Sequence, residues 1–184
     1  MTERNCGGLD RKGNLEDVAD VVIRDARISD VPAIAVLAQE KRIQYAKYQP
    51  QFWNVAPHAE RVHRPWLEAL VCDESVVSIV AEHDGAAGVC GFLLATVGST
   101  PPVYDAGGDT ATVDDFVVSP PDAGMTVGTA LLDAGKAQLR EQGVAQIVVV
   151  CGQRDGPKRR ALADAGLSVA SEWYVGDLRS SHDA

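Results

Sequence analysis

The stretch “FVVSPPDAGMTVGTALL”, residues 116–132, decides the fold of this chain. An apolar run ends at two prolines, a short segment with one glycine follows, and apolar residues then return at helical spacing. This pattern predicts a strand, a tight loop and a helix. The unpaired amides and the dipole at the start of such a helix favour a bound anion. The loop is therefore a candidate phosphate site, although Asp122 and Ala123 stand where a cation would help.

The composition indicates one globular domain without nucleic acid or a membrane as partner. The chain has 184 residues, of which 46% are hydrophobic and 23% are charged, enough for a sizeable core. The formal net charge of −9 argues against the basic face that binds nucleic acid. No apolar run has the length of a membrane span. Residues 1–20 lack the apolar stretch of a signal peptide, so we expect a flexible arm followed by a single domain over residues 21–184.

The cysteines favour a reducing, cytoplasmic environment. They are widely spaced along the chain: Cys6, Cys72, Cys90 and Cys151. The last three lie within or beside apolar segments, which is typical of buried thiols and not of a disulfide framework or a metal site. His58 and His63 are five residues apart, which keeps them off a common helical face, so we expect no metal site.

Up to the opening stretch, the pattern predicts a strand, two helices and three further strands. “VVIRDARISD” opens with a short strand, and “VPAIAVLAQEKRIQYAKY” has roughly helical spacing. A second helix is expected to be interrupted near Pro65. Apolar β-branched runs then flank Asp84–Gly85, a dipeptide typical of a tight hairpin turn. “TATVDDFVVS” is the third of these strands.

After the opening stretch, helices and strands alternate. The helix “VGTALLDAGKAQLREQG” should stop at Gly143. “AQIVVVC” has no polar alternation, so we expect a strand covered on both faces. A short helix from Pro157 to Gly166 and a last strand, “LSVASEWYVGDL”, complete the chain. The predicted order is β-α-α-β-β-β-α-β-α-β, an α/β fold with a mixed sheet and helices on both faces.

In this order, four pieces of the chain resemble the GCN5-related N-acetyltransferase (GNAT) superfamily, from about Val21 to Leu178. They are “IRDARISD”, “VAEHDGAAGVCGFLLATV”, “VDDFVVSPPDAGMTVGTALL” and “DGPKRRALADAGL”. The resemblance implies the acyl-CoA N-acyltransferase fold. It also implies transfer of an acetyl group from acetyl-CoA to an amine of a small molecule or peptide, by direct attack in a ternary complex.

The resemblance further implies an acetyl-CoA site along the opening stretch. Pantetheine would lie in a gap between the fourth and fifth strands, against the backbone of Val117 and Val118. The pyrophosphate would lie on the amides of the following loop and helical turn. By position these residues are Gly124, Met125, Thr126, Val127, Gly128 and Thr129. On the last helix, Asp155 and Lys158 would contribute to the cofactor site, with Lys158 near the adenosine 3′-phosphate.

Three positions depart from the family pattern. Ala123 replaces an arginine or glutamine that would contact phosphate, and Thr126 replaces a glycine in the same loop. Leu162 replaces the tyrosine that serves as general acid. These departures leave a second hypothesis open, a non-catalytic domain of the same fold that binds a ligand or a partner. Such domains also tend to dimerise, so a homodimer is a further expectation.

The chain offers candidate acids and bases for acyl transfer. The reaction needs an uncharged amine, a donor to the developing oxyanion and a proton for the departing sulfur. Asp115 and Asp114 are the candidate bases, with Asp115 preferred because the resemblance often places an acid in “DDFVV”. A desolvated carboxylate there should have a raised pKa, whereas the alternative is a partner for a cap or an arginine. The backbone N–H of Val118 would polarise the carbonyl, and Tyr174 on the last strand is a candidate acid.

Aromatic residues gather in the region that shapes the acceptor pocket in this family. They are Tyr45, Tyr48, Phe52, Trp53 and Trp66. Packing between two helices explains them at least as well as contact with an apolar or cationic acceptor. Lys41 and Arg42 are expected on the solvated surface of the first helix.

Overall fold

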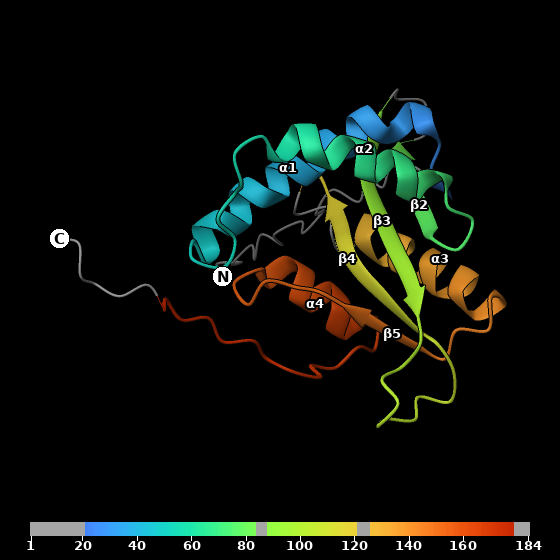
Figure 1. Ribbon diagram of the computed structural model, residues 1–184. Coiled ribbons are helices and arrows are strands. Elements are labelled where there is room, and N and C mark those ends of the chain that lie inside the picture. The colour runs from blue at the N-terminus through green and yellow to red at the C-terminus, as the bar shows by residue number, and fades with distance from the viewer. Residues whose placement is uncertain (1–20, 84–87, 121–125, 179–184) are drawn as a thin grey trace, which may run out of the picture.

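The computed structural model describes residues 21–83, 88–120 and 126–178, and a five-stranded sheet runs through its centre (Figure 1). The strands lie in chain order, the first four antiparallel and the fifth parallel to the fourth. They are β1 Val21–Asp25, β2 Val77–His83, β3 Val89–Gly98, β4 Thr110–Val118 and β5 Gln146–Val149. The helices are the 3₁₀ turn η1 Ile28–Asp30, then α1 Val31–Tyr48, α2 Ala59–Cys72, α3 Val127–Glu141 and α4 Gly156–Asp164. The predicted mixed α/β architecture is confirmed.

Both faces of the sheet are covered, because side chains alternate along its central strands. Figure 1 shows α1 and α2 on one side of the sheet and α3 on the other. The core under α1 and α2 includes Val31, Ile34, Leu37, Leu67, Val80, Phe92 and Leu94. The core under α3, which α4 also joins, includes Ile79, Leu93, Val113, Phe116, Leu131, Leu132, Leu139 and Leu162. Adjacent residues such as Phe92 and Leu93 therefore pack into the cores on opposite faces of the sheet.

The ends of α3 and α4 agree with the local sequence signals. α3 ends at Glu141, and Gly143 follows with a φ of 78°, a left-handed conformation that glycine adopts without steric cost. α4 carries Pro157 in its first turn, and its end is followed by Gly166 with a φ of 81°. Both predicted stops are confirmed.

Two predicted elements differ in detail from the structure. α2 continues through Pro65, which lies on an exposed side of the helix where the unpaired carbonyl one turn earlier can be hydrated. β5 is not covered on both faces, because its residues alternate between exposed and half-buried. Gln146 and Val148 are accordingly exposed.

The expected last strand is wrong. Residues 167–178 form neither helix nor strand, and Trp173 within them is 82% exposed. None of the described strands pairs with this segment, so its alternating apolar pattern alone is not enough to make it a strand. The expected turn at Asp84–Gly85 and the arm over residues 1–20 lie outside the described residues, although β2 and β3 pair antiparallel as a hairpin requires.

We expect Leu131→Ala to lower the free energy of unfolding by about 2–5 kcal/mol, the usual cost of truncating a buried leucine. Leu131 is fully buried between α3 and the sheet. The control Val36→Ala truncates a side chain of α1 that is 58% exposed, and should change the same quantity by less than about 0.5 kcal/mol. Urea denaturation followed by circular dichroism measures both variants. Equal losses would contradict this description of the core.

Candidate active site

β4 and β5 part halfway along β4. Their pairing covers Thr110–Val113 and Gln146–Val149, and one further bond runs from the N–H of Val150 to the carbonyl of Val113 at 2.9 Å. β4 continues to Val118 beside β3, so within the described residues its last part has no strand on the β5 side. The sheet therefore opens at this point.

The open edge presents the backbone of Phe116 and Val118. The Ser119 N–H donates to the Cys90 carbonyl on β3 at 2.8 Å, which fixes the alternation of the antiparallel ladder. By that alternation the backbone groups of Val117 point toward β3, and those of Phe116 and Val118 point away from it. Of the two residues expected to face pantetheine, Val118 has its backbone on the open side and Val117 does not.

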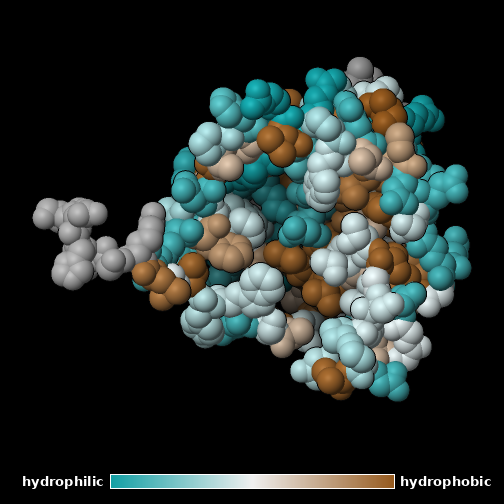
Figure 2. Space-filling view, in the orientation of Figure 1, coloured by the Kyte–Doolittle hydropathy of each residue, from teal (hydrophilic) through white to brown (hydrophobic). Residues whose placement is uncertain are grey.

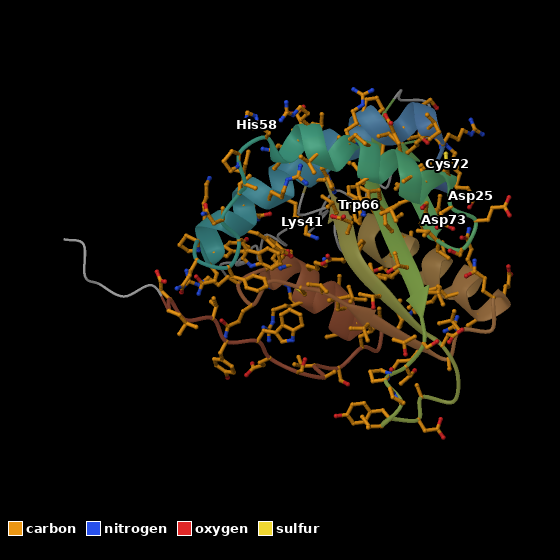
Figure 3. The ribbon with its side chains drawn as sticks, viewed as in Figure 1. Asp25, Lys41, His58, Trp66, Cys72 and Asp73 are labelled. Carbon is orange, nitrogen blue, oxygen red and sulfur yellow. The ribbon has the colours of Figure 1, made fainter. Side chains whose placement is uncertain are left out.

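A pocket occupies this opening, between α1 on one side and α4 on the other. Its lining consists of Glu40, Lys41, Gln44, Phe116, Val117, Val118, Ser119, Asp155, Pro157, Lys158 and Ala161. Figure 3 shows Lys41 pointing from α1 toward the space between β4 and α4. In Figure 2, hydrophobic residues are scattered among hydrophilic ones on this face of the molecule. The site is thus a mixed polar and apolar cleft.

Two lysines meet at the open edge of β4. Lys41 Nζ donates to the carbonyls of Asp114 at 3.2 Å and Phe116 at 3.4 Å. Lys158 Nζ donates to the same Phe116 carbonyl at 3.2 Å. Burial lowers the pKa of Lys158 well below its ordinary value, and the charge of Lys41 lowers it further. The expectation that Lys41 lies on the solvated surface is wrong, because Lys41 reaches into the cleft.

Asp155 lines the cleft but is bound to the protein itself. Its Oδ1 accepts the Lys158 N–H at 3.1 Å as the N-cap of α4, and its Oδ2 accepts the Tyr45 hydroxyl at 2.8 Å. The same hydroxyl accepts the Gly152 N–H at 3.2 Å. Burial raises the pKa of Tyr45, which therefore stays protonated. One phenol thus joins α1 to the start of α4.

Asp115 is paired with His63, a residue that the sequence analysis considered only as a metal ligand. His63 Nε2 lies 3.7 Å from Asp115 Oδ2, and Arg42 donates to His63 Nδ1 at 2.8 Å. Because a guanidinium only donates, Nδ1 is the acceptor and the ring proton is on Nε2, facing Asp115. The His63 ring stacks on Trp66 with centroids 5.2 Å apart. Arg42 is therefore part of a half-buried cluster and not a free surface residue.

The expected rise in the Asp115 pKa is wrong. Burial raises the pKa of this carboxyl, but His63 and the cations Lys41 and Lys158 outweigh burial and hold the pKa below its ordinary value. Asp114, the other candidate base, is exposed and forms a β-bulge, since Leu94 pairs with Asp115. The two aspartates thus differ: the Asp115 carboxylate is paired with His63, and Asp114 is exposed to solvent.

The start of α3 packs on Phe116 and Val118 of β4, which also line the cleft. A Cβ added to Gly128 would lie 3.3 Å from Phe116 Cζ and 3.6 Å from Val118 Cγ2, so the first turn of the helix packs on the end of β4. Thr126 is exposed at the N-cap, and Val127 is buried. The first backbone bond within α3 runs from the Ala130 N–H to the Thr126 carbonyl at 3.1 Å. Gly124 and Met125 lie outside the described residues.

The remaining candidates lie away from the cleft lining. Tyr174 is 89% exposed, and its hydroxyl donates to Glu172 at 2.8 Å. The aromatic residues of α1 and the following loop pack ring against ring, with Tyr45 and Trp53 centroids 5.1 Å apart. Trp66 belongs instead to the His63 stack. Cys72 is exposed, against expectation, whereas Cys90 is buried.

Val117, Val118, Asp155 and Lys158 were expected at the cofactor site and line the cleft, whereas Lys41 and His63 were missed. Lys158, Ala161 and Leu162 follow helical spacing on the buried face of α4, so a lysine stands where an apolar residue is usual. Lys41 and His63 meet their partners only through distant contacts along the chain. No local pattern marks such contacts.

The chain belongs to the acetyltransferase (GNAT) family, whose model matches residues 40–166. A predicted acetyltransferase from Clostridium acetobutylicum, solved with acetyl-CoA, has 16% identity and a TM-score of 0.64, over 86% of this chain and 96% of that one. A GCN5-related N-acetyltransferase from Ralstonia eutropha JMP134 has 19% identity and a TM-score of 0.65, over 85% and 98%. The aminoglycoside N-acetyltransferase AAC(6′)-Iy, in complex with CoA, has 14% identity and a TM-score of 0.65, over 91% and 100%. At these identities the likeness establishes the shared fold.

No curated protein matches the chain significantly. Among the described residues, none of the helices combines the length and apolar character that crossing a bilayer requires. The same part of the chain holds no group of three or more His, Cys, Asp and Glu side chains arranged to bind a metal.

We expect Asp115→Asn to lower the free energy of unfolding by about 1 kcal/mol at neutral pH, through loss of a charge-assisted contact with His63. A carboxyl with a lowered pKa stabilises the folded state above its ordinary pKa of 3.8, and this stabilisation is lost as the pH falls through the lowered value. The gap between wild type and variant should therefore close in acid. Thermal melts across the pH range measure it. Asp114→Asn is the control and should show no such gap.

Proposed function

We propose that this protein transfers an acetyl group from acetyl-CoA to an amine of a small molecule or peptide, in a ternary complex. One observation carries the proposal: β4 parts from β5 next to the first turn of α3. An open strand edge supplies backbone groups for an extended amide chain, and a helix start supplies amides for a diphosphate. The open edge and the helix start are adjacent, as the pantetheine and the diphosphate are in coenzyme A. Membership of the family and the acetyl-CoA or CoA in similar structures support the same cofactor.

In this proposal, pantetheine runs along the edge of β4 past Phe116 and Val118. The pyrophosphate binds the amides from Gly124 to Thr129, using backbone groups in place of the cationic side chain that Ala123 lacks. The Val118 N–H on the open side is the donor to the oxyanion. Asp155 and Lys158 border the opposite wall of the cleft.

The proposed base is a carboxylate of β4. Asp115 is held as the carboxylate by His63 and the neighbouring lysines, and its lowered pKa makes it a weaker base than an ordinary aspartate. Asp114 is the solvated alternative. Tyr174 remains a candidate acid only if residues 167–178 approach the cleft when substrates bind, since its hydroxyl faces Glu172 in this structure.

A second candidate function is a non-catalytic domain of the same fold. The observation that favours it is the occupied edge of β4, where Lys41 and Lys158 already bond the Phe116 carbonyl. An incoming pantetheine must compete with them. The departures at Ala123, Thr126 and Leu162 favour the same alternative.

Thermal melts with CoA and acetyl-CoA separate the two candidates. At a concentration about 100 times its dissociation constant, a ligand should raise the midpoint by roughly 5 °C or more. Release of free thiol with a panel of amines, amino acids and peptides then tests catalysis. No shift at millimolar CoA would reject the enzyme proposal, and a shift without thiol release would favour the non-catalytic domain.

We expect Thr126→Glu to weaken CoA binding at least about tenfold and Thr126→Gln to change it less than about threefold. Thr126 is exposed at the N-cap of α3, where a carboxylate suits the helix dipole and leaves the fold intact but repels a diphosphate. Isothermal titration calorimetry at low salt gives both affinities, since added salt would screen the repulsion. Identical affinities of the two variants for CoA would contradict binding of the diphosphate at the start of α3.

A further inference from the structure

The cleft holds an unusual pair of amines. Lys41 Nζ and Lys158 Nζ lie 3.4 Å and 3.2 Å from the same Phe116 carbonyl oxygen, so the two nitrogens are no farther apart than the sum of these distances. They come from α1 and α4, on opposite walls of the cleft. Lys158 is only 9% exposed. A single carbonyl oxygen thus accepts from two side chains that each have three donors.

Neither amine has an acidic partner among the described residues. No carboxylate there lies within 4.0 Å of either nitrogen, although Glu40 and Asp155 also line the cleft. Asp155 is bound to Tyr45 and to the backbone of α4. Buried cations in proteins are normally paired, because an unpaired charge loses its hydration without return. The two amines thus have no carboxylate in direct contact. Their nearest compensation is the ring of Tyr45, 5.2 Å from Lys41 Nζ, the ring of Phe116, 5.1 Å from Lys158 Nζ, and the longer-range attraction of Asp115.

Burial and mutual repulsion depress the Lys158 pKa. An anion between the two nitrogens would reverse that effect, since it would let both amines keep their protons. A carboxylate has two oxygens and can accept from both lysines at once.

The pair lies beside the backbone that the proposed function assigns to the reacting carbonyl. Lys41 bonds the Asp114 carbonyl as well as that of Phe116, and Lys158 bonds that of Phe116. Phe116 is two residues before Val118, a separation of roughly 7 Å along a strand, and both present their backbone on the open side. The two amines thus lie near the Val118 N–H, where the acyl group and the acceptor amine would meet.

We propose that Lys41 and Lys158 bind a carboxylate of the substrate, so that the site selects a carboxylate-bearing acyl donor or acceptor. The inference rests on the proposed function for the orientation of the cleft. It changes the expected substrate class from neutral to anionic at the reacting end. Binding of a carboxylate by the two lysines depends only on their positions at the open edge of β4, and not on the proposed acetyl transfer.

The donor arm of the test compares succinyl-CoA with acetyl-CoA by isothermal titration calorimetry on the full chain. If the carboxylate belongs to the acyl group, succinyl-CoA should bind at least about tenfold more tightly, as expected for one charge-assisted hydrogen bond. Lys41→Met and Lys158→Met keep the length of the side chain and remove the ammonium. In each of these variants, the affinities for succinyl-CoA and acetyl-CoA should become nearly equal, with a ratio close to one.

Lys47→Met is the matched control, since it removes the same charge from an exposed position on α1. It should leave the ratio unchanged. A ratio that survives in both Lys41→Met and Lys158→Met contradicts the proposal. So does an equal loss of affinity for CoA, acetyl-CoA and succinyl-CoA in these variants, because the lysines would then serve the part of the cofactor that all three share.

The acceptor arm measures thiol release from acetyl-CoA with amino acids and with their amides. If the acceptor carries the carboxylate, the amino acid should be preferred, and its KM should rise at least about tenfold in Lys41→Met and Lys158→Met but not in Lys47→Met. A lysine-dependent preference in either arm supports the proposal and identifies the source of the carboxylate. Its absence from both arms overturns the proposal.

Failure of the proposed function gives a different result, in which no CoA compound binds. Thermal melts with succinate and glutarate then test the lysine pair alone. A rise in the midpoint that disappears in Lys41→Met and Lys158→Met but not in Lys47→Met supports a carboxylate site. No rise with either dicarboxylate overturns it.

Discussion

The edge of β4 beyond Val113 must satisfy its hydrogen bonds without a neighbouring strand. Backbone carbonyls that face a half-buried cleft need donors, and β5 stops supplying them where the two strands part. The protein supplies lysine ammonium groups from two helices instead. The cleft, its charge and its polar lining all follow from this one interruption of the ladder.

The charges around that edge are arranged in two groups. On the α2 side, the carboxylate of Asp115 has His63 beside it, and Arg42 holds the histidine in one tautomer. On the α4 side, Lys158 is buried with no acidic partner in the described part of the chain. In a chain with a net charge of −9, the cleft lining carries two lysines, Lys41 and Lys158, beside two acidic residues, Glu40 and Asp155.

The sequence predicts the elements whose signals are local. The start of α3, the stop at Gly143 and the start of α4 at Pro157 each depend on a few adjacent residues. The burial of β5 and the state of residues 167–178 depend on which strand lies beside them, and alternation of apolar residues does not contain that information.

The residues of the site likewise fall into those with a local sequence signal and those placed by contacts distant in sequence. Thr126 and Gly128 follow from the loop pattern, and Lys158 stands out on an apolar helix face. Lys41 and His63 depend on contacts between helices and β4 that are distant in sequence. Their positions arise from tertiary packing, which also makes an aspartate of β4 more acidic where desolvation alone would have made it less so.

The hydroxyl of Tyr45 is shared by two walls of the cleft, because it donates to Asp155 at the start of α4 while its ring belongs to α1. A ligand that pushes these helices apart must stretch or break that contact. This contact and the Gly152 N–H bond to the same hydroxyl therefore set the spacing of α1 and α4 across the cleft.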